Sequence, residues 1–145
     1  MTYVVDNRGM PMARRFELSD FIWRNMQKNV TSADIAKANY TIISSENGVI
    51  LGVGLIYKNP DDKAVNIQSL CVKKEKRNIG IGSELLTEIK EHARSIGIAG
   101  IELHVDIDNI DKEYDSARLQ NWYMRHGFQI QESNDKEMKM KWSAN

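Results

Sequence analysis

The sequence contains little of what disulfide-bonded, zinc-binding or membrane-inserted proteins need. Its single cysteine, Cys71, excludes an intramolecular disulfide. Histidines stand at positions 92, 104 and 126, and none has the Cys/His spacing of a zinc site. The longest apolar run, Val49 to Tyr57, is too short to span a bilayer, and early charged residues interrupt any signal-peptide core. We therefore expect a soluble cytoplasmic protein with no metal and no membrane partner.

The chain also has no excess of charge of either sign. Its 20 Lys and Arg residues balance 20 Asp and Glu residues, so the formal net charge is zero at pH 7. This balance argues against a broad nucleic-acid-binding surface but does not exclude a local basic patch. With 145 residues, of which 41% are hydrophobic, the composition is that of an ordinary globular protein. We expect a single domain over residues 1–145.

Hydrophobic periodicity and turn residues predict a mixed α/β fold. The expected helices are about Leu18–Asn29, Thr31–Ala38, Ser83–Ile96, and one from Asp115 or Ser116 to His126. The expected strands are Thr2–Val5, Tyr40–Ser44, Val49–Lys58, Ala64–Val72, Ile101–Val105, Phe128–Ile130 and Met138–Trp142. The strand, helix and strand between Ala64 and Val105 form a βαβ unit, so these two strands should be parallel. Antiparallel strands precede this crossover, and a strand pair follows it.

A glycine-containing loop joins strand Ala64–Val72 to the long helix. It reads Arg77-Asn78-Ile79-Gly80-Ile81-Gly82-Ser83. The first N–H groups of a helix have no intrahelical partner and carry partial positive charge, so this junction suits a phosphate or pyrophosphate. The loop matches neither the Walker pattern nor the dinucleotide fingerprint, which needs a glycine where this chain has Leu85. Taken alone, the pattern fits an ordinary strand-to-helix turn equally well.

A second pattern occupies the last expected helix. It reads Arg118-Leu119-Gln120-Asn121-Trp122-Tyr123-Met124-Arg125-His126-Gly127-Phe128. Alone, it is typical of a core-packing helix that ends at a glycine. Together, in this order and about 40 residues apart, the two segments closely resemble the GCN5-related N-acetyltransferase superfamily. The loop is similar to that family's Arg/Gln-x-x-Gly-x-Gly/Ala pattern, and the helix to its Arg-Leu-x-x-Phe-Tyr-x-Arg-His-Gly-Phe pattern. The resemblance is strong from about Ala64 to Phe128, whereas the N-terminal third matches only in the order of its elements.

The resemblance implies a fold in which strands Ala64–Val72 and Ile101–Val105 splay apart to admit acetyl-CoA. Backbone groups of Leu70 and Val72 would pair with the pantetheine arm as an added strand would. Arg77 would place a cation near the pyrophosphate, with a solvated surface arginine as the alternative. The implied cofactor-binding residues are Leu70, Cys71, Val72, Arg77, Asn78, Ile79, Gly80, Ile81, Gly82, Ser83, Ser116, Leu119, Trp122, Tyr123 and Arg125.

The implied reaction is direct transfer of the acetyl group to an amine, with no covalent enzyme intermediate. A backbone N–H near Leu70 to Val72 would bind the oxyanion of the tetrahedral intermediate. Tyr123 is the candidate acid for the CoA thiolate, because a phenol with a pKa of about 10 and a thiol with a pKa of about 8.5 are reasonably matched. The alternative is a structural tyrosine packed beside the cofactor. We expect Cys71 to be a small buried apolar residue rather than a nucleophile.

The residue that would accept the amine proton is the point where the chain departs from the family. Many members carry a glutamate at the position of Asn66, and an asparagine side chain cannot accept that proton. His104 is the best substitute by its usual pKa, with a histidine satisfied within the sheet as the alternative. Glu102, which shares the face of His104 by strand alternation, and a water chain to solvent are further options.

The acceptor is defined only as an amine: a small molecule, a polyamine, a peptide N-terminus or a lysine. A cluster of acidic residues lies between strand Ile101–Val105 and the last helix: Asp106, Asp108, Asp111, Glu113 and Asp115. These side chains would attract a cationic amine. The alternative is that they form a solvated polar loop. The family resemblance also allows a homodimer.

Two other functions fit the same fold. A non-catalytic acyl-CoA-binding or regulatory module is favoured by Asn66, whereas the intact Tyr123 favours an enzyme. An acetyltransferase toxin acting on charged tRNA could use a basic patch formed by Lys73, Lys74, Lys76 and Arg77, although the zero net charge weighs against it.

Overall fold

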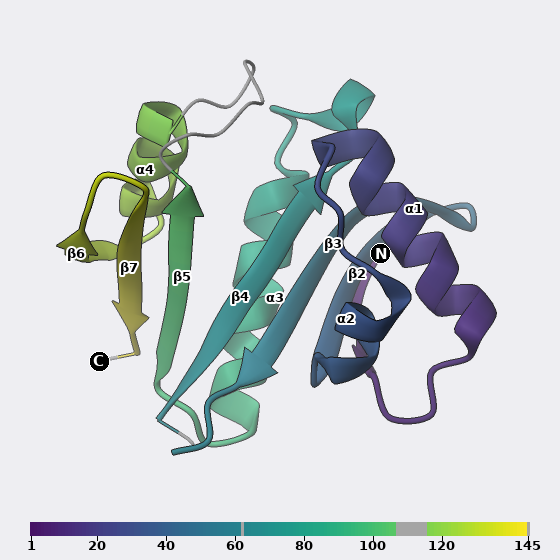
Figure 1. Ribbon diagram of the computed structural model, residues 1–145, viewed down its shortest axis with the longest axis horizontal. Helices are drawn as coiled ribbons and strands as arrows, with labels where there is room; N and C mark the ends of the chain where they lie inside the picture. Colours follow the sequence, from purple (N-terminus) through teal and green to yellow (C-terminus); the bar gives the residue numbers. More distant parts are fainter. Residues whose placement is uncertain (62, 107–115, 145) are drawn as a thin grey trace.

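The computed structural model describes residues 1–61, 63–106 and 116–144, which form a seven-stranded sheet with helices on both faces (Figure 1). The strands are β1 (Thr2–Asp6), β2 (Tyr40–Glu46), β3 (Val49–Lys58), β4 (Ala64–Val72), β5 (Gly100–Asp106), β6 (Gln129–Ser133) and β7 (Glu137–Ser143). The helices are α1 (Met12–Met26), α2 (Ser32–Lys37), α3 (Ile81–Ser95) and α4 (Ser116–Arg125), with a short 3-10 turn at Lys74–Lys76.

The sheet has the strand order β1-β2-β3-β4-β5-β7-β6. Neighbouring strands are antiparallel except β4 and β5, which confirms the expected single parallel crossover. The parallel pairing runs only from Ala64 opposite Gly100 to Ile67 opposite Leu103. Beyond Ile67 the two strands diverge towards their carboxyl ends, as Figure 1 shows. The expected splay is therefore present.

Each face of the sheet has its own hydrophobic core. Helix α3 buries one stripe of side chains against the sheet: Ile81, Leu85, Leu86, Ile89 and Ala93. Tyr123 and Phe128, from α4 and the residues after it, belong to the same core. Helices α1 and α2 cover the opposite face with Leu18, Ile22 and Ile35. Apolar side chains at helical spacing thus fix both layers.

Helix α1 differs from its prediction. It begins at Met12 and ends at Met26, whereas the spacing of apolar residues placed it at Leu18–Asn29. Pro11, the residue before the helix, makes no side-chain cap, and the first turn contains no acidic residue, so no local signal marks the true start. The second expected helix is confirmed: the Thr31 hydroxyl accepts from the Asp34 N–H at 3.1 Å, and the Asp34 carboxylate accepts from the Thr31 N–H at 2.9 Å.

Two features of the sheet were not predicted. Strand β7 lies between β5 and β6, so the final strand pair joins the sheet through its second member. Strand β4 contains a bulge, because Leu55 pairs with Ser69 and Ile56 with Ile67, which leaves Gln68 without an opposite residue. No helix among the described residues is long and apolar enough to cross a membrane.

Candidate active site

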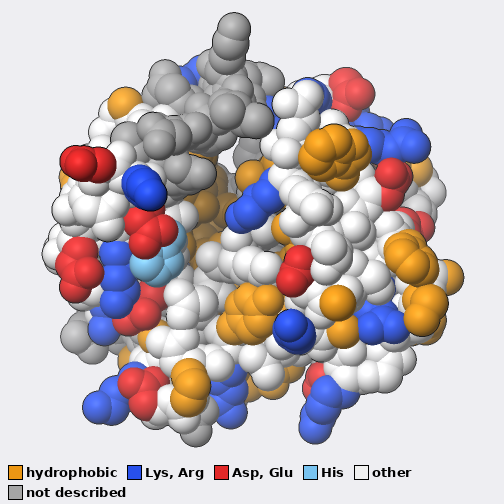
Figure 2. Space-filling view, viewed as in Figure 1, with side chains coloured by type: hydrophobic (Ala, Val, Ile, Leu, Met, Phe, Trp, Pro, Cys, Tyr) orange, Lys and Arg blue, Asp and Glu red, His pale blue; other side chains and the backbone are white. Residues whose placement is uncertain are grey.

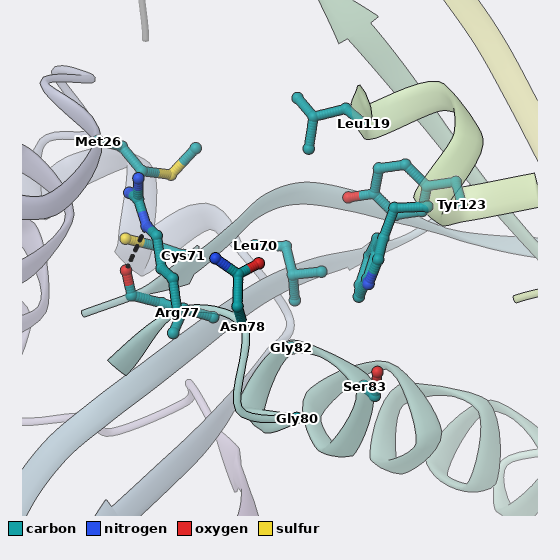
Figure 3. Close-up of a pocket in the computed structure, with 12 residues that line it drawn as sticks. Met26, Leu70, Cys71, Arg77, Asn78, Gly80, Gly82, Ser83, Leu119 and Tyr123 are labelled. Atoms are coloured by element: carbon teal, nitrogen blue, oxygen red, sulfur yellow. Dashed lines mark hydrogen bonds between the residues drawn. The ribbon is translucent and has the colours of Figure 1, made fainter. Parts of the chain in front are cut away.

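A cavity of about 150 Å³ lies where β4 diverges from β5 (Figure 3). Its walls come from the carboxyl half of β4, the glycine loop, the first turn of α3, the end of α1 and one side of α4. The lining residues are Met26, Leu70, Cys71, Val72, Arg77, Asn78, Gly80, Gly82, Ser83, Leu119, Trp122 and Tyr123. The two sequence motifs, about 40 residues apart, thus meet across one cavity.

The glycine loop opens directly into the first turn of α3. Gly80 is the residue before the helix and has a φ of 98°, a left-handed conformation that favours glycine. The helix begins at Ile81, so the N–H groups of its first turn have no carbonyl partner within the helix. A cavity beside such a turn is suited to an anion.

Gly82, in the first turn of α3, lies against the Trp122 side chain of α4. A Cβ atom at this position would lie 3.2 Å from Cζ2 of Trp122 and 3.8 Å from Cγ2 of Val72. A side chain here would therefore crowd the indole ring, which explains a glycine inside the first turn of a helix.

Arg77 lies in the cavity wall, but backbone carbonyls hold its guanidinium. Its Nε donates to the carbonyl of Val72 at 3.3 Å, the dashed line in Figure 3, and its Nη2 donates to the carbonyl of Asn25. The buried Asn25 also accepts a hydrogen bond at Oδ1 from the Lys74 N–H, at 3.0 Å. Arg77 and Asn25 together join the end of α1 to the end of β4, so the cation has a fixed position.

Tyr123 forms the wall opposite β4. Its side chain is only 7% exposed, and its hydroxyl points into the cavity, as Figure 3 shows. The ring packs edge-on against Trp122 at 4.9 Å and Phe128 at 5.4 Å between centroids. Burial raises the pKa of Tyr123 well above its usual value. The phenol therefore keeps its proton throughout the neutral range, and it is a weaker acid than the match of pKa values in the sequence analysis assumed.

His126 ties α4 to α3. Its Nε2 lies 3.2 Å from the Ser83 hydroxyl, and its carbonyl accepts a hydrogen bond from Lys90 Nζ at 2.7 Å. Burial lowers the pKa of His126, with smaller contributions in the same direction from the charges of Lys90 and Arg125. The neutral imidazole thus helps to fix the wall that carries Tyr123.

A second, more open cavity of about 670 Å³ adjoins the first along β4. From β4 it takes Asn66, Ile67 and Gln68, which only Ser69 separates from the strand residues that line the first cavity. Lys28, Tyr57, His104, Lys136 and Glu137 complete its lining. Figure 2 shows acidic and basic side chains gathered over β5 and β7 beside a hollow in this face of the molecule.

Asn66 and His104 have different surroundings in the second cavity. The Asn66 amide donates to Asn59 Oδ1, and the Asn59 amide donates to Glu102 Oε2 at 3.4 Å. His104 is half-exposed, and its Nδ1 lies 3.4 Å from Oε1 of Glu137. The first position is therefore tied into a side-chain network, whereas the second presents an imidazole at the cavity wall.

Comparison with protein families agrees with this geometry. The family model for the acetyltransferase (GNAT) family matches residues 10–128. The chain belongs to the GNAT acetyltransferase family. The match extends across the N-terminal third, where the motifs alone gave only the order of elements.

Solved GNAT structures share the fold over nearly the whole chain. The aminoglycoside 6'-N-acetyltransferase from Enterococcus faecium superposes with a TM-score of 0.76 at 16% identity, over 100% of this chain and 97% of that one. The ribosomal-protein-S18-alanine N-acetyltransferase from Escherichia coli gives 0.77 at 14% identity, over 100% and 95%. PaiA N-acetyltransferase from Thermoplasma acidophilum, in complex with coenzyme A, gives 0.75 at 12% identity, over 99% of each chain.

Most of the cofactor residues that the GNAT resemblance implied line the first cavity, and four do not. Ile79 and Arg125 are exposed, and Ser116 is half-buried. Ile81 is buried in the core between α3 and the sheet. For Ile79 and Ile81 the implied contribution is a backbone N–H, which stays a prediction. The Cys71 side chain is buried, as expected of a small apolar residue.

Some predicted residues lie outside the part of the chain that the structure describes, and two residues of the site were not predicted. Of the expected acidic rim, positions 107–115 and the side chain of Asp106 lie outside the described residues. The described residues contain no group of three or more His, Cys, Asp or Glu side chains that could hold a metal ion. Met26 and Asn25 were missed; the signal for Asn25 is a polar residue on the buried stripe that also contains Leu18 and Ile22.

Proposed function

We propose that this protein is an acetyl-CoA-dependent N-acetyltransferase that transfers the acetyl group directly to an acceptor amine. The observation that carries the proposal is the open edge of β4. Leu70 pairs with Gly54 and Val72 with Gly52 on the β3 side, whereas the other edge of this half of β4 borders the cavity. An extended pantetheine arm can add to this edge as a further strand.

The glycine loop and the first turn of α3 fit the pyrophosphate. The first helical N–H groups offer donors to an anion, and Gly82 leaves the helix surface bare beneath Trp122. Arg77 contributes positive charge from a position fixed by the carbonyls of Val72 and Asn25. Arginine in such a position favours a bound diphosphate without a side-chain rearrangement.

The chemical step needs three groups around the thioester. The amine nitrogen attacks the carbonyl carbon, a backbone N–H near Leu70 to Val72 stabilises the oxyanion, and the C–S bond then breaks. Tyr123 donates its proton to the departing thiolate, and His104 accepts the proton lost by the amine. The tyrosinate and the imidazolium return to their starting forms by exchange with solvent.

The acceptor enters from the second cavity. This cavity begins on β4 where the first one ends and contains His104, so an amine here would approach the thioester from the side opposite the cofactor loop. The relatives act on an aminoglycoside and on a protein alanine, as their names state. For this chain, we propose an amine-bearing small molecule, peptide N-terminus or lysine.

Release of free thiol from acetyl-CoA in the presence of a panel of amines tests this proposal. The panel contains aminoglycosides, polyamines, peptides with free N-termini and lysine peptides. We expect turnover with at least one class, and a kcat reduced about a hundredfold or more in Tyr123→Phe. Tyr3→Phe, which removes a hydroxyl in β1 away from both cavities, serves as the matched control.

The principal alternative is a non-catalytic acyl-CoA-binding module. The specific observation in its favour is Asn66, whose amide is hydrogen-bonded to Asn59 at the position where many family members carry a carboxylate. Tight acetyl-CoA binding by calorimetry without turnover of any amine class would establish this alternative. Absence of acetyl-CoA binding would contradict both functions.

A further inference from the structure

The face of β5 and β7 next to the second cavity carries a regular pattern of charged side chains. In the antiparallel register, Glu102 lies opposite Lys141, His104 opposite Lys139, and Asp106 opposite Glu137. Residues two apart on a strand share a face, so Glu102, His104, Glu137 and Lys139 all lie on the same side of the sheet. This face presents its polar groups in pairs rather than as isolated charges.

Two diagonal pairs with the same offset form on this face. Lys139 Nζ lies 3.8 Å from Glu102 Oε2, and Glu137 Oε1 lies 3.4 Å from His104 Nδ1. Diagonal neighbours on antiparallel strands are within reach of long side chains. Lys139 lies directly opposite His104 but contacts Glu102, so it does not pair with the Glu137 carboxylate. Lys139 and His104 thus each face a different carboxylate.

His104 occupies a particular place in the fold. It is the first residue of β5 after Leu103, the last residue paired with β4, so it stands where the two strands begin to diverge. His104 and Glu137 both line the second cavity, together with Asn66 and Gln68 of β4. Glu102, by contrast, is only 16% exposed at its side chain and is engaged by Asn59 and Lys139.

We propose that Glu137 is the positioning residue for His104, and that this pair replaces the carboxylate missing at Asn66. The inference rests on the proposed acetyltransferase function. A carboxylate at Nδ1 holds the proton of the neutral imidazole on that nitrogen and leaves the Nε2 lone pair as the acceptor. The amine proton moves to Nε2 as the N–C bond forms, and the Glu137 carboxylate stabilises the resulting imidazolium without itself taking the proton.

Both partners are carried by strands rather than loops. Seven residue pairs, from Gly100 opposite Ser143 to Asp106 opposite Glu137, hold β5 and β7 in register. The other charged groups that line the cavity are Lys28 and Lys136, and Lys28 Nζ donates to the Gln68 carbonyl at 3.2 Å. Among the described residues that line the cavity, Glu137 thus supplies the carboxylate next to the His104 imidazole.

The test compares Glu137→Ala with Glu91→Ala, which removes an exposed carboxylate on α3 away from both cavities. With the amine identified by the thiol-release panel, we expect Glu137→Ala to lower kcat about tenfold or more and to leave KM for acetyl-CoA unchanged. We expect Glu91→Ala to match the wild type. His104→Gln should lower kcat at least as much, and the double variant should be no slower than His104→Gln because the two residues act as a unit.

A second readout needs no substrate. The ¹⁵N chemical shifts of the neutral His104 imidazole should show the Nδ1–H form in the wild type and a shift towards the Nε2–H form in Glu137→Ala. An Nε2–H form in the wild type, or an unchanged kcat in Glu137→Ala of an active enzyme, would overturn the inference and leave the proposed function intact. No turnover of any amine by the wild type would instead remove the proposed function, and with it the catalytic part of the inference.

Discussion

A Cβ atom on Gly82 would lie 3.2 Å from Cζ2 of Trp122, so the first turn of α3 and the side of α4 meet at the smallest residue available. This contact lies between the helix start that we propose binds the pyrophosphate and the helix that carries Tyr123. Together with the Ser83–His126 contact, it holds the two walls of the cavity against each other.

Gly82→Ala tests this relationship. Alanine is favoured over glycine in a helix by about 1 kcal/mol, which offsets part of the cost of displacing the Trp122 ring. We expect a change in the free energy of unfolding of less than about 1 kcal/mol, together with a several-fold loss of acetyl-CoA affinity measured by calorimetry.

Gly80→Ala is the contrasting variant. Its two chain neighbours aside, no atom of the described residues lies within 4 Å of a Cβ at position 80, but the φ of 98° is strained for alanine. The Gly80→Ala substitution should lower the free energy of unfolding by about 1–2 kcal/mol. Wild-type affinity in Gly82→Ala would show that the Trp122 contact does not shape the cofactor site.

Tyr123 gives a prediction for alkaline stability. Burial raises its pKa in the folded state, whereas a tyrosine in the unfolded chain has a pKa of about 10. The folded state therefore holds its proton to higher pH than the unfolded state. The corresponding stability is fully present below pH about 10 and is lost above it by up to about 1.4 kcal/mol per pH unit.

Urea unfolding of the wild type and of Tyr123→Phe at several pH values measures this effect. The difference in unfolding free energy between the two proteins should be constant up to pH about 10 and should then fall as pH rises. Two stability curves that stay parallel up to pH about 11 would show that the Tyr123 hydroxyl titrates normally in the folded protein.

Arg77 is predicted to stabilise the fold as well as the cofactor. Removing a charged donor from the carbonyls of Val72 and Asn25 should destabilise the protein by about 2 kcal/mol, because these carbonyls lose their partner. Chemical unfolding of Arg77→Ala measures the loss. The control is Lys76→Ala at the exposed neighbouring position, where we expect a change within about 0.5 kcal/mol. Equal stability of the two variants would contradict the role of Arg77 in joining α1 to β4.

Local sequence patterns were sufficient for some parts of the fold. The bounds of β3 and β4 match their predictions, because apolar runs end at clear turn residues such as Gly48 and Pro60. The start of α1 was missed because no side-chain cap and no acidic first turn mark it, and Phe16, within that first part, faces solvent. Periodicity reports that side chains share a face of a helix, and burial of that face depends on what packs against it.

Part of the candidate site could also be predicted from local patterns. The residues of the two motifs could be located because the start of a helix and the position of a glycine can be recognised within a short stretch of sequence. Met26 reaches the cavity from α1, and Glu137 reaches His104 only because β7 lies beside β5. Strand order and helix docking are set by long-range packing, so no pattern within one element could have revealed these two contacts.

We propose that the open edge of β4 and the start of α3 bind acetyl-CoA. A crystal structure of the complex between the protein and acetyl-CoA would show this binding directly. We expect pantetheine amides hydrogen-bonded to the backbone of Leu70 and Val72, with the pyrophosphate on N–H groups between Asn78 and Ser83. Acetyl-CoA bound elsewhere, or contacts that leave this half of β4 unpaired, would contradict it.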